Sequence, residues 1–124
     1  MTLLEGLRVL LVDDDEDMRE LLTIALEQQG MTVVSAASGT QALAELVREG
    51  VDLMLCDLSL PDMDGDVLLT RIRNEQSGPP AIAISGYRIA EPSPFDAHLM
   101  KPVEFDQLTA VMASVVERAR TKRS

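Results

Sequence analysis

Residues 51–65, VDLMLCDLSLPDMDG, decide the fold of this chain of 124 residues. The stretch from Val51 to Cys56 is apolar almost without alternation, which is typical of a strand buried on both faces of a parallel sheet. Asp57 ends this run, so we expect it at the carboxyl edge of a central strand, where open α/β sheets bind their ligands. The turn that follows, PDMDG, ends in Gly65, a residue able to adopt positive φ.

Strand and helix patterns alternate on both sides of this stretch. Short apolar runs predict further strands at residues 8–12, 32–36, 81–85 and 97–100. Apolar residues at helical spacing predict helices that end before Gly30 and before Gly50, a third over 66–74 and a last from 103 to about 121. Alternation of this kind indicates a parallel sheet with helices on both faces.

The composition narrows the class of protein. We expect residues 1–124 to form a single domain, because the length is close to the commonest domain size. The net charge of −10 argues against direct binding of nucleic acid or of an anionic membrane. The single cysteine, Cys56, excludes an internal disulfide, and we expect it to pack in the core of a protein from a reducing compartment. With no apolar stretch of membrane length and no signal-peptide pattern, the cytoplasm is the expected location.

Five consecutive acids, residues 13–17, follow the first predicted strand directly. Since that strand is expected beside the one that carries Asp57, some of these carboxylates should lie close to it. Such a cluster repels itself unless a cation is bound, and a few hard oxygen ligands suit Mg²⁺. For residues 15–17 a simpler explanation is that they stabilise the start of the next helix. That explanation does not account for Asp13 and Asp14, which belong to the strand end.

Two further polar residues end predicted strands. Ser85 ends the strand at 81–85, and Lys101 follows the strand at 97–100. A hydroxyl and an ammonium opposite a carboxylate with a bound metal can hold three phosphoryl oxygens, one on Mg²⁺, one on Ser85 and one on Lys101. Phosphoryl transfer needs little more than such positioning and charge neutralisation. Taken singly, a serine or lysine at such a place is more often structural or solvated.

These residues together resemble the receiver domain of two-component response regulators, over essentially the whole chain. The motifs that carry the resemblance are Val12-Asp13-Asp14, Asp57 with Pro61-x-x-Asp64-Gly65, Ser85-Gly86, and Lys101-Pro102. The resemblance implies a flavodoxin-like, doubly wound α/β fold with a five-stranded parallel sheet of order 2-1-3-4-5. The phrase FDAHLMKPV at residues 95–103 is similar to receivers attached to hybrid histidine kinases.

The resemblance also implies a phosphoacceptor site. Asp57 would accept a phosphoryl group from a phosphohistidine on a histidine kinase or a histidine phosphotransfer protein, and the domain would then switch conformation. Asp14, Asp57 and the backbone carbonyl of Ser59 would bind Mg²⁺, for which Mn²⁺ can substitute, and Asp13 would act through water. Self-phosphorylation from a small phosphodonor and slow autodephosphorylation are expected, rather than conventional enzyme activity.

Four more residues receive roles from the same resemblance. Ser85 and Lys101 would grip the phosphoryl group, and the backbone of Gly86 would contact it. Ser85 would also act as a switch residue, together with His98, which takes the place usually given to an aromatic residue. A parent hybrid kinase or a separate effector protein would then receive the signal.

The sequence departs from the family between residues 86 and 96. Only 11 residues, with Pro92 and Pro94 among them, join the last two strands, where the family has a full helix. Two prolines in so short a span exclude a multi-turn helix over most of it. We therefore expect a short irregular link in place of that helix, and an altered output.

Three alternatives compete with a phosphoacceptor receiver. The first is a degenerate receiver that acts only as a protein-docking module. The second, a phosphatase similar to haloacid dehalogenases, would have a second acid where this chain has Ser59, and a cap domain besides. The third is a flavodoxin-like nucleotide binder, which would have a Gly-rich or hydroxyl-rich phosphate loop where this chain has five acids that repel phosphate.

Overall fold

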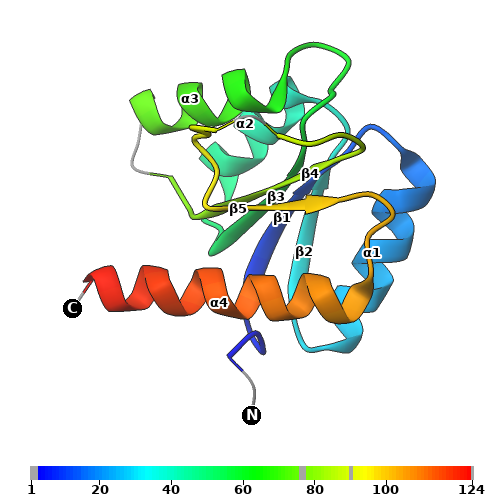
Figure 1. Ribbon diagram of the computed structural model, residues 1–124, viewed down its shortest axis with the longest axis vertical. Helices are drawn as coiled ribbons and strands as arrows, with labels where there is room; N and C mark the ends of the chain where they lie inside the picture. The colour runs from blue at the N-terminus through cyan, green and yellow to red at the C-terminus, as the bar shows by residue number, and fades with distance from the viewer. Residues whose placement is uncertain (1–2, 76–77, 90, 124) are drawn as a thin grey trace.

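Five parallel strands form the centre of the molecule (Figure 1). The structure is a computed structural model and describes residues 3–75, 78–89 and 91–123, with side chains as far as residue 121. The strands are β1 (Arg8–Val12), β2 (Thr32–Ala36), β3 (Leu53–Asp57), β4 (Ala81–Ser85) and β5 (Ala97–Met100). They lie in the order β2-β1-β3-β4-β5, which confirms the predicted flavodoxin-like topology.

Helices cover both faces of this sheet. They are α1 (Glu16–Gln28), α2 (Gly39–Arg48), α3 (Gly65–Glu75) and α4 (Phe105–Arg123). Figure 1 shows α2 and α3 on one face, with α1 and α4 on the other. The sheet therefore divides the core into two clusters, and each cluster contains the buried side chains of one pair of helices. Within the described ranges, no helix is both long enough and apolar enough to cross a lipid bilayer.

The central strand β3 brings the functional edge together. All five of its residues are buried, as its apolar run predicts. Its register places Cys56 beside Val12 of β1 and Asp57 beside Ile84 of β4. Because the strands are parallel, the residues that follow β1, β3 and β4 meet at one edge of the sheet.

The first helix begins at the acidic run. Asp15 is the N-cap of α1, and its side chain accepts hydrogen bonds from the backbone N–H groups of Asp17 and Met18. Capping of this kind stabilises a helix start by about 1 kcal/mol. The expected role of stabilising the helix start is therefore confirmed for Asp15, whereas Asp13 and Asp14 lie before the helix.

An irregular link joins β4 to β5, as the two prolines predict. Among the residues of 86–96 that the structure describes, which exclude Ala90, none is helical. The link runs on the side of the sheet that carries α3 (Figure 1). There Phe95 is buried and Ile89 packs against the same core cluster as α2 and α3. The Asp96 carboxylate then fixes the end of the link, accepting hydrogen bonds from the Ala81 N–H at 2.8 Å and from Arg73 at 3.1 Å.

Candidate functional site

The Asp57 carboxylate lies at the end of β3 with only 6% of the residue exposed. Its Oδ1 atom accepts a hydrogen bond from the Ser59 N–H at 3.0 Å, and its Oδ2 atom accepts one from Lys101 Nζ at 2.8 Å. Lys101 is itself held at the sheet edge, because its backbone N–H donates to the Ser85 carbonyl at 2.8 Å. Both oxygens of Asp57 are thus fixed, one by the following loop and one by an ammonium group.

Two more carboxylates join Asp57, as the acidic run predicts. Asp13, Asp14 and Asp57 each offer an oxygen, and these atoms all lie within 4.8 Å of one another. Asp13 is buried, and its Oδ1 accepts a hydrogen bond from the Asp15 N–H at 2.9 Å, whereas Asp14 is exposed. The cluster therefore has two enclosed carboxylates and one that faces solvent.

The charges in this cluster are out of balance. Burial raises the pKa of the Asp13 carboxyl, against the hydrogen bond from Asp15, and the charge of Asp57 raises it further. Burial alone would lower the pKa of Lys101, but the hydrogen bond to Asp57 and the neighbouring carboxylates outweigh it and raise that pKa. One ammonium thus faces three carboxylates, and such a set of hard oxygen atoms fits a small divalent cation.

The loop of residues 58–65 folds back tightly against Asp57. The Gly65 N–H donates to the Leu58 carbonyl at 2.8 Å, and Ser59 pairs with Asp64 in an isolated antiparallel bridge. Gly65 is able to adopt positive φ but does not do so here, since the glycines with positive φ are Gly6, Gly30 and Gly78. Space is the reason for glycine here: a Cβ atom at position 65 would lie 2.9 Å from the Asp57 carbonyl oxygen.

Ser85 lies at the same edge, but its hydroxyl is turned toward the link. The residue is buried, and its Oγ donates to the Tyr87 carbonyl at 2.8 Å and accepts from the Tyr87 N–H at 3.0 Å. Gly86 is exposed, and a Cβ atom built there would have no neighbour within 4 Å among the described residues. The space beside the Gly86 backbone is therefore open.

His98 lies on β5, where its register partner on β4 is Ala83. Its Nδ1 atom is 3.6 Å from a carboxylate oxygen of Glu91, which belongs to the link. Its Nε2 atom is buried and has no hydrogen-bond partner among the described residues. His98 thus belongs to the edge strand β5, and its side chain lies close to Glu91 of the link that follows Ser85.

Asp62, which no sequence pattern singled out, ties the loop to α2. Its carboxylate accepts hydrogen bonds from the backbone N–H groups of Gly39 and Thr40, both at 2.9 Å, and from the Thr40 hydroxyl at 2.6 Å. The Thr40 hydroxyl first, and then these backbone groups, lower the pKa of Asp62 to about 2. The motif PDMDG marks a turn, but the donors lie 22 and 23 residues earlier in the chain. A local pattern carries no signal for such a contact.

Cys56 packs in the core, as predicted. Its side chain is buried in the cluster under α2 and α3, and its Sγ donates to the Asp57 carbonyl at 3.2 Å. Burial, followed by the charge of Asp57, strongly raises the pKa of the thiol. The thiolate that redox and metal chemistry require is therefore disfavoured.

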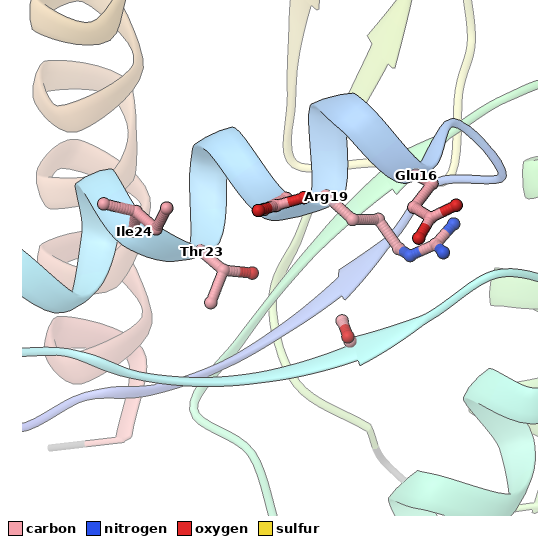
Figure 2. A pocket seen from close by; sticks show the side chains of 6 residues that line it. Glu16, Arg19, Thr23 and Ile24 are labelled. Carbon is pink, nitrogen blue, oxygen red and sulfur yellow. The ribbon is translucent and has the colours of Figure 1, made fainter.

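A groove between α1 and the edge strand β2 lies beside the cluster. The residues that line it are Glu16, Arg19, Glu20, Thr23, Ile24 and Ser35. Figure 2 shows Glu16 and Arg19 close together near the start of α1. Arg19 joins the groove to the site, because its Nη1 donates to the backbone carbonyl of Asp13 at 2.7 Å. With two acids and one base, the groove carries a net negative charge.

Comparison with known protein families identifies this arrangement. The response regulator receiver domain family matches residues 9–113. The chain belongs to that family. The receiver is 38% identical over 112 residues to an uncharacterized 14.6 kDa protein of Leptolyngbya boryana, and the match covers 84% of this chain and 86% of the relative.

Other similar proteins include a much longer protein and a solved structure of similar length. It is 32% identical to part of the sensor histidine kinase RcsC of Salmonella typhi, and the match covers 97% of this chain but 13% of that protein. Among solved structures, the CheY-like receiver domain protein of Methanospirillum hungatei JF-1 has a TM-score of 0.87 and 30% identity, covering 95% of this chain and 99% of that one. The chain thus spans most of some relatives and a small part of others.

Family membership settles the class of function. The chain is a receiver domain of two-component signalling, and receivers act with histidine kinases or histidine phosphotransfer proteins. The phosphatase and nucleotide-binder alternatives are therefore wrong.

Proposed function

We propose that Asp57 of this receiver accepts a phosphoryl group from a phosphohistidine on a histidine kinase or a histidine phosphotransfer protein. The observation that carries the proposal is the place of Asp57, between Lys101 at 2.8 Å and the carboxylates of Asp13 and Asp14. In the reaction, the bond between phosphorus and the histidine nitrogen breaks while a bond to a carboxylate oxygen of Asp57 forms. The imidazole leaves with the electron pair of the broken bond and is neutralised by a proton.

The residues around Asp57 have separate tasks in this proposal. The Ser59 N–H holds Oδ1 of the acceptor in place. Lys101 neutralises the acceptor before transfer and a phosphoryl oxygen after it, which is the positioning and charge stabilisation that phosphoryl transfer requires. Ser85 gives up its contact with the Tyr87 carbonyl and donates to a second phosphoryl oxygen. The Gly86 N–H contacts the phosphoryl group from the open side of the site.

Mg²⁺ is the proposed cofactor, and the residues present fit it. Three carboxylates, of Asp13, Asp14 and Asp57, lie within 4.8 Å of one another and face the single ammonium group of Lys101, which supports a bound cation. Asp14, Asp57 and the Ser59 carbonyl would hold the ion, with Asp13 acting through water, and Mn²⁺ would serve in its place. When bound, the ion would neutralise charge on the phosphoryl oxygens.

The switch and the output follow from the same site. We propose that His98 follows Ser85 when the hydroxyl turns, because His98 lies on the strand next to β4 and contacts Glu91 of the link. The receiver of residues 1–124 would pass its signal to a parent hybrid kinase or to a separate effector. A cytoplasmic location fits the single reduced cysteine.

Phosphorylation with a small donor tests the proposal. Acetyl phosphate with Mg²⁺ should add one phosphoryl group, visible in the intact-mass spectrum and lost slowly on standing. The variant Asp57→Asn should remain unmodified, and chelation of Mg²⁺ should abolish labelling of the natural chain. An unmodified natural chain that still binds a histidine kinase would instead indicate a docking module, and labelling of Asp57→Asn would place the acceptor elsewhere.

A further inference from the structure

The loop after the phosphoacceptor is fastened to the start of α2 by one carboxylate. Asp62 Oδ1 accepts from the Gly39 N–H, and Oδ2 accepts from both the N–H and the hydroxyl of Thr40. Gly39 and Thr40 are the first two residues of α2, so their N–H groups have no partner within the helix. Each oxygen of Asp62 thus has its own donors, and the contact fixes both the place and the orientation of the carboxyl group.

Met63, the residue after Asp62, also packs against the start of α2. Met63 packs against Gly39 so tightly that a Cβ atom at position 39 would lie 2.5 Å from the Met63 sulfur. The helix also has a cap of its own, because Ser38 Oγ accepts from the Gln41 N–H at 3.1 Å. The contacts of Asp62 and Met63 therefore add to that of the usual cap, and they hold the loop in place as well as the helix.

The other end of the same loop holds the phosphoacceptor. Ser59 pairs with Asp64 across the loop, and the Ser59 N–H donates to Asp57 Oδ1 at 3.0 Å. A short continuous path of contacts thus leads from α2 through Asp62 and the Ser59–Asp64 bridge to the carboxylate of Asp57. Asp62 and Ser59 therefore belong to one loop that is closed by its own backbone bonds.

We propose that Asp62 is a positioning residue for the Asp57 site: by fastening the loop to α2, it fixes Ser59 and thereby sets cation affinity and the rate of Asp57 phosphorylation. The last two effects rest on the proposed function, whereas the fixing of Ser59 does not. Asp62 touches neither the phosphoryl group nor the cation, and it acts only through the loop.

Three substitutions separate positioning from helix stability and from charge. Asp62→Asn keeps the shape of the side chain but has one acceptor oxygen instead of two. The N–H groups of Gly39 and Thr40 now donate to different oxygens, so at least one of them loses its partner. Thr40→Val removes only the hydroxyl contact and leaves the charge of Asp62 intact. Ser38→Ala is the matched control, because it removes a cap from the same helix without touching the loop.

The measurements are made on the whole chain. Amide hydrogen exchange of Ser59 is followed without metal, Mg²⁺ affinity is measured by calorimetry, and the initial rate of phosphorylation is measured with phosphoramidate. Loss of a hydrogen bond to a charged group predicts that Asp62→Asn speeds Ser59 exchange about tenfold and lowers both other quantities about fivefold. Thr40→Val should act in the same direction by about twofold to threefold, and Ser38→Ala should leave all three within about twofold.

Two results would overturn the proposal. Ser59 exchange that is unchanged in Asp62→Asn would mean that the contact serves only the helix. Equal effects of Asp62→Asn and Ser38→Ala would assign the changes to helix stability. If the natural chain neither bound Mg²⁺ nor accepted a phosphoryl group, the proposed function would fail by itself, and the Ser59 exchange rates would still decide whether Asp62 fixes the loop.

Discussion

Two connections leave the carboxyl edge of the sheet side by side, and they are built differently. The loop of residues 58–65 after β3 is held along its length by the Leu58–Gly65 and Ser59–Asp64 pairings and by the Asp62 carboxylate. The link of residues 86–96 after β4 is held mainly at its two ends. In its described part, the hydrogen bonds lie at the start, around Tyr87, and at the end, from Ser93 to Asp96.

From the proposed function, we expect the loop to serve the chemistry of this receiver and the link to serve its output. Transfer of a phosphoryl group depends on placement of the reacting groups to within a fraction of an ångström, and the rigid loop supplies that placement at Asp57. A signal, in contrast, needs an element with more than one arrangement of similar free energy. We expect the link to meet that need, because its buried anchor is Phe95 and its hydrogen bonds lie at its two ends.

The largest expected effect comes from the anchor of the link. Phe95→Ala removes a buried aromatic ring next to α3 and should lower the free energy of unfolding by about 3–5 kcal/mol in urea titrations. The matched control is Tyr87→Ala, which removes an exposed ring from the same link and should cost less than about 1 kcal/mol. A loss below about 1 kcal/mol for Phe95→Ala would mean that the link is not anchored at all.

A pair of glycine substitutions compares the two connections directly. Gly65→Ala brings a Cβ atom to 2.9 Å from the Asp57 carbonyl oxygen, so overpacking should lower the free energy of unfolding by about 1–3 kcal/mol. Gly86→Ala meets open space and should change it by no more than about 0.5 kcal/mol. Urea titrations measure both, and equal costs would contradict the contrast drawn between a rigid loop and a looser link.

The acidic cluster predicts a dependence on pH. Burial raises the pKa of Asp13 above its ordinary 3.8, so stability is lost as pH rises from that value through the higher pKa of the folded state. Asp13→Asn keeps an acceptor for the Asp15 N–H and removes the charge, and should raise the free energy of unfolding by about 1 kcal/mol at pH 7 without metal. Urea titrations in a chelator should show this gain shrinking toward pH 3.5. A gain that persists unchanged at low pH would contradict the assignment.

The smallest effect is expected at the contact between link and sheet. Glu91 is largely exposed and lies 3.6 Å from His98, so Glu91→Gln should lower the free energy of unfolding by at most about 0.5 kcal/mol. Urea titrations of the natural chain and of the variant measure the difference. A loss above about 1 kcal/mol would mean that this pair fixes the link as firmly as Asp62 fixes the loop.

The sequence predicted the strands and the carboxylate cluster because these follow from local patterns. A continuous apolar run predicts a buried strand, and parallel topology then brings the residues after each run to one edge. Asp13, Asp14, Asp57 and Lys101 were found in this way, and the structure brings them together. Proline likewise predicted the irregular link, because it removes a helix donor at a known position.

Other features of the site depend on contacts between distant segments. Asp62 is one of several acids in its turn, and only the approach of α2 distinguishes it. The crowding of Gly65 by the Asp57 carbonyl was not predicted, since it arises only when the loop folds back. Ser85 was placed correctly at the edge, but the direction of its hydroxyl depends on the path that the chain takes through Tyr87. Tertiary packing, rather than propensity, decides all three.

The bond between Ser85 and Tyr87 offers an optical test of the proposed switch. The chain has no tryptophan and a single tyrosine, so its tyrosine emission comes from one ring. The backbone of that tyrosine both donates to and accepts from the Ser85 hydroxyl. In the proposed switch, Ser85 turns toward a phosphoryl group and the Tyr87 carbonyl loses its donor. We expect the surroundings of the Tyr87 ring to change as well, so fluorescence of the unlabelled natural protein should follow the turn of Ser85 in real time, without any engineered probe.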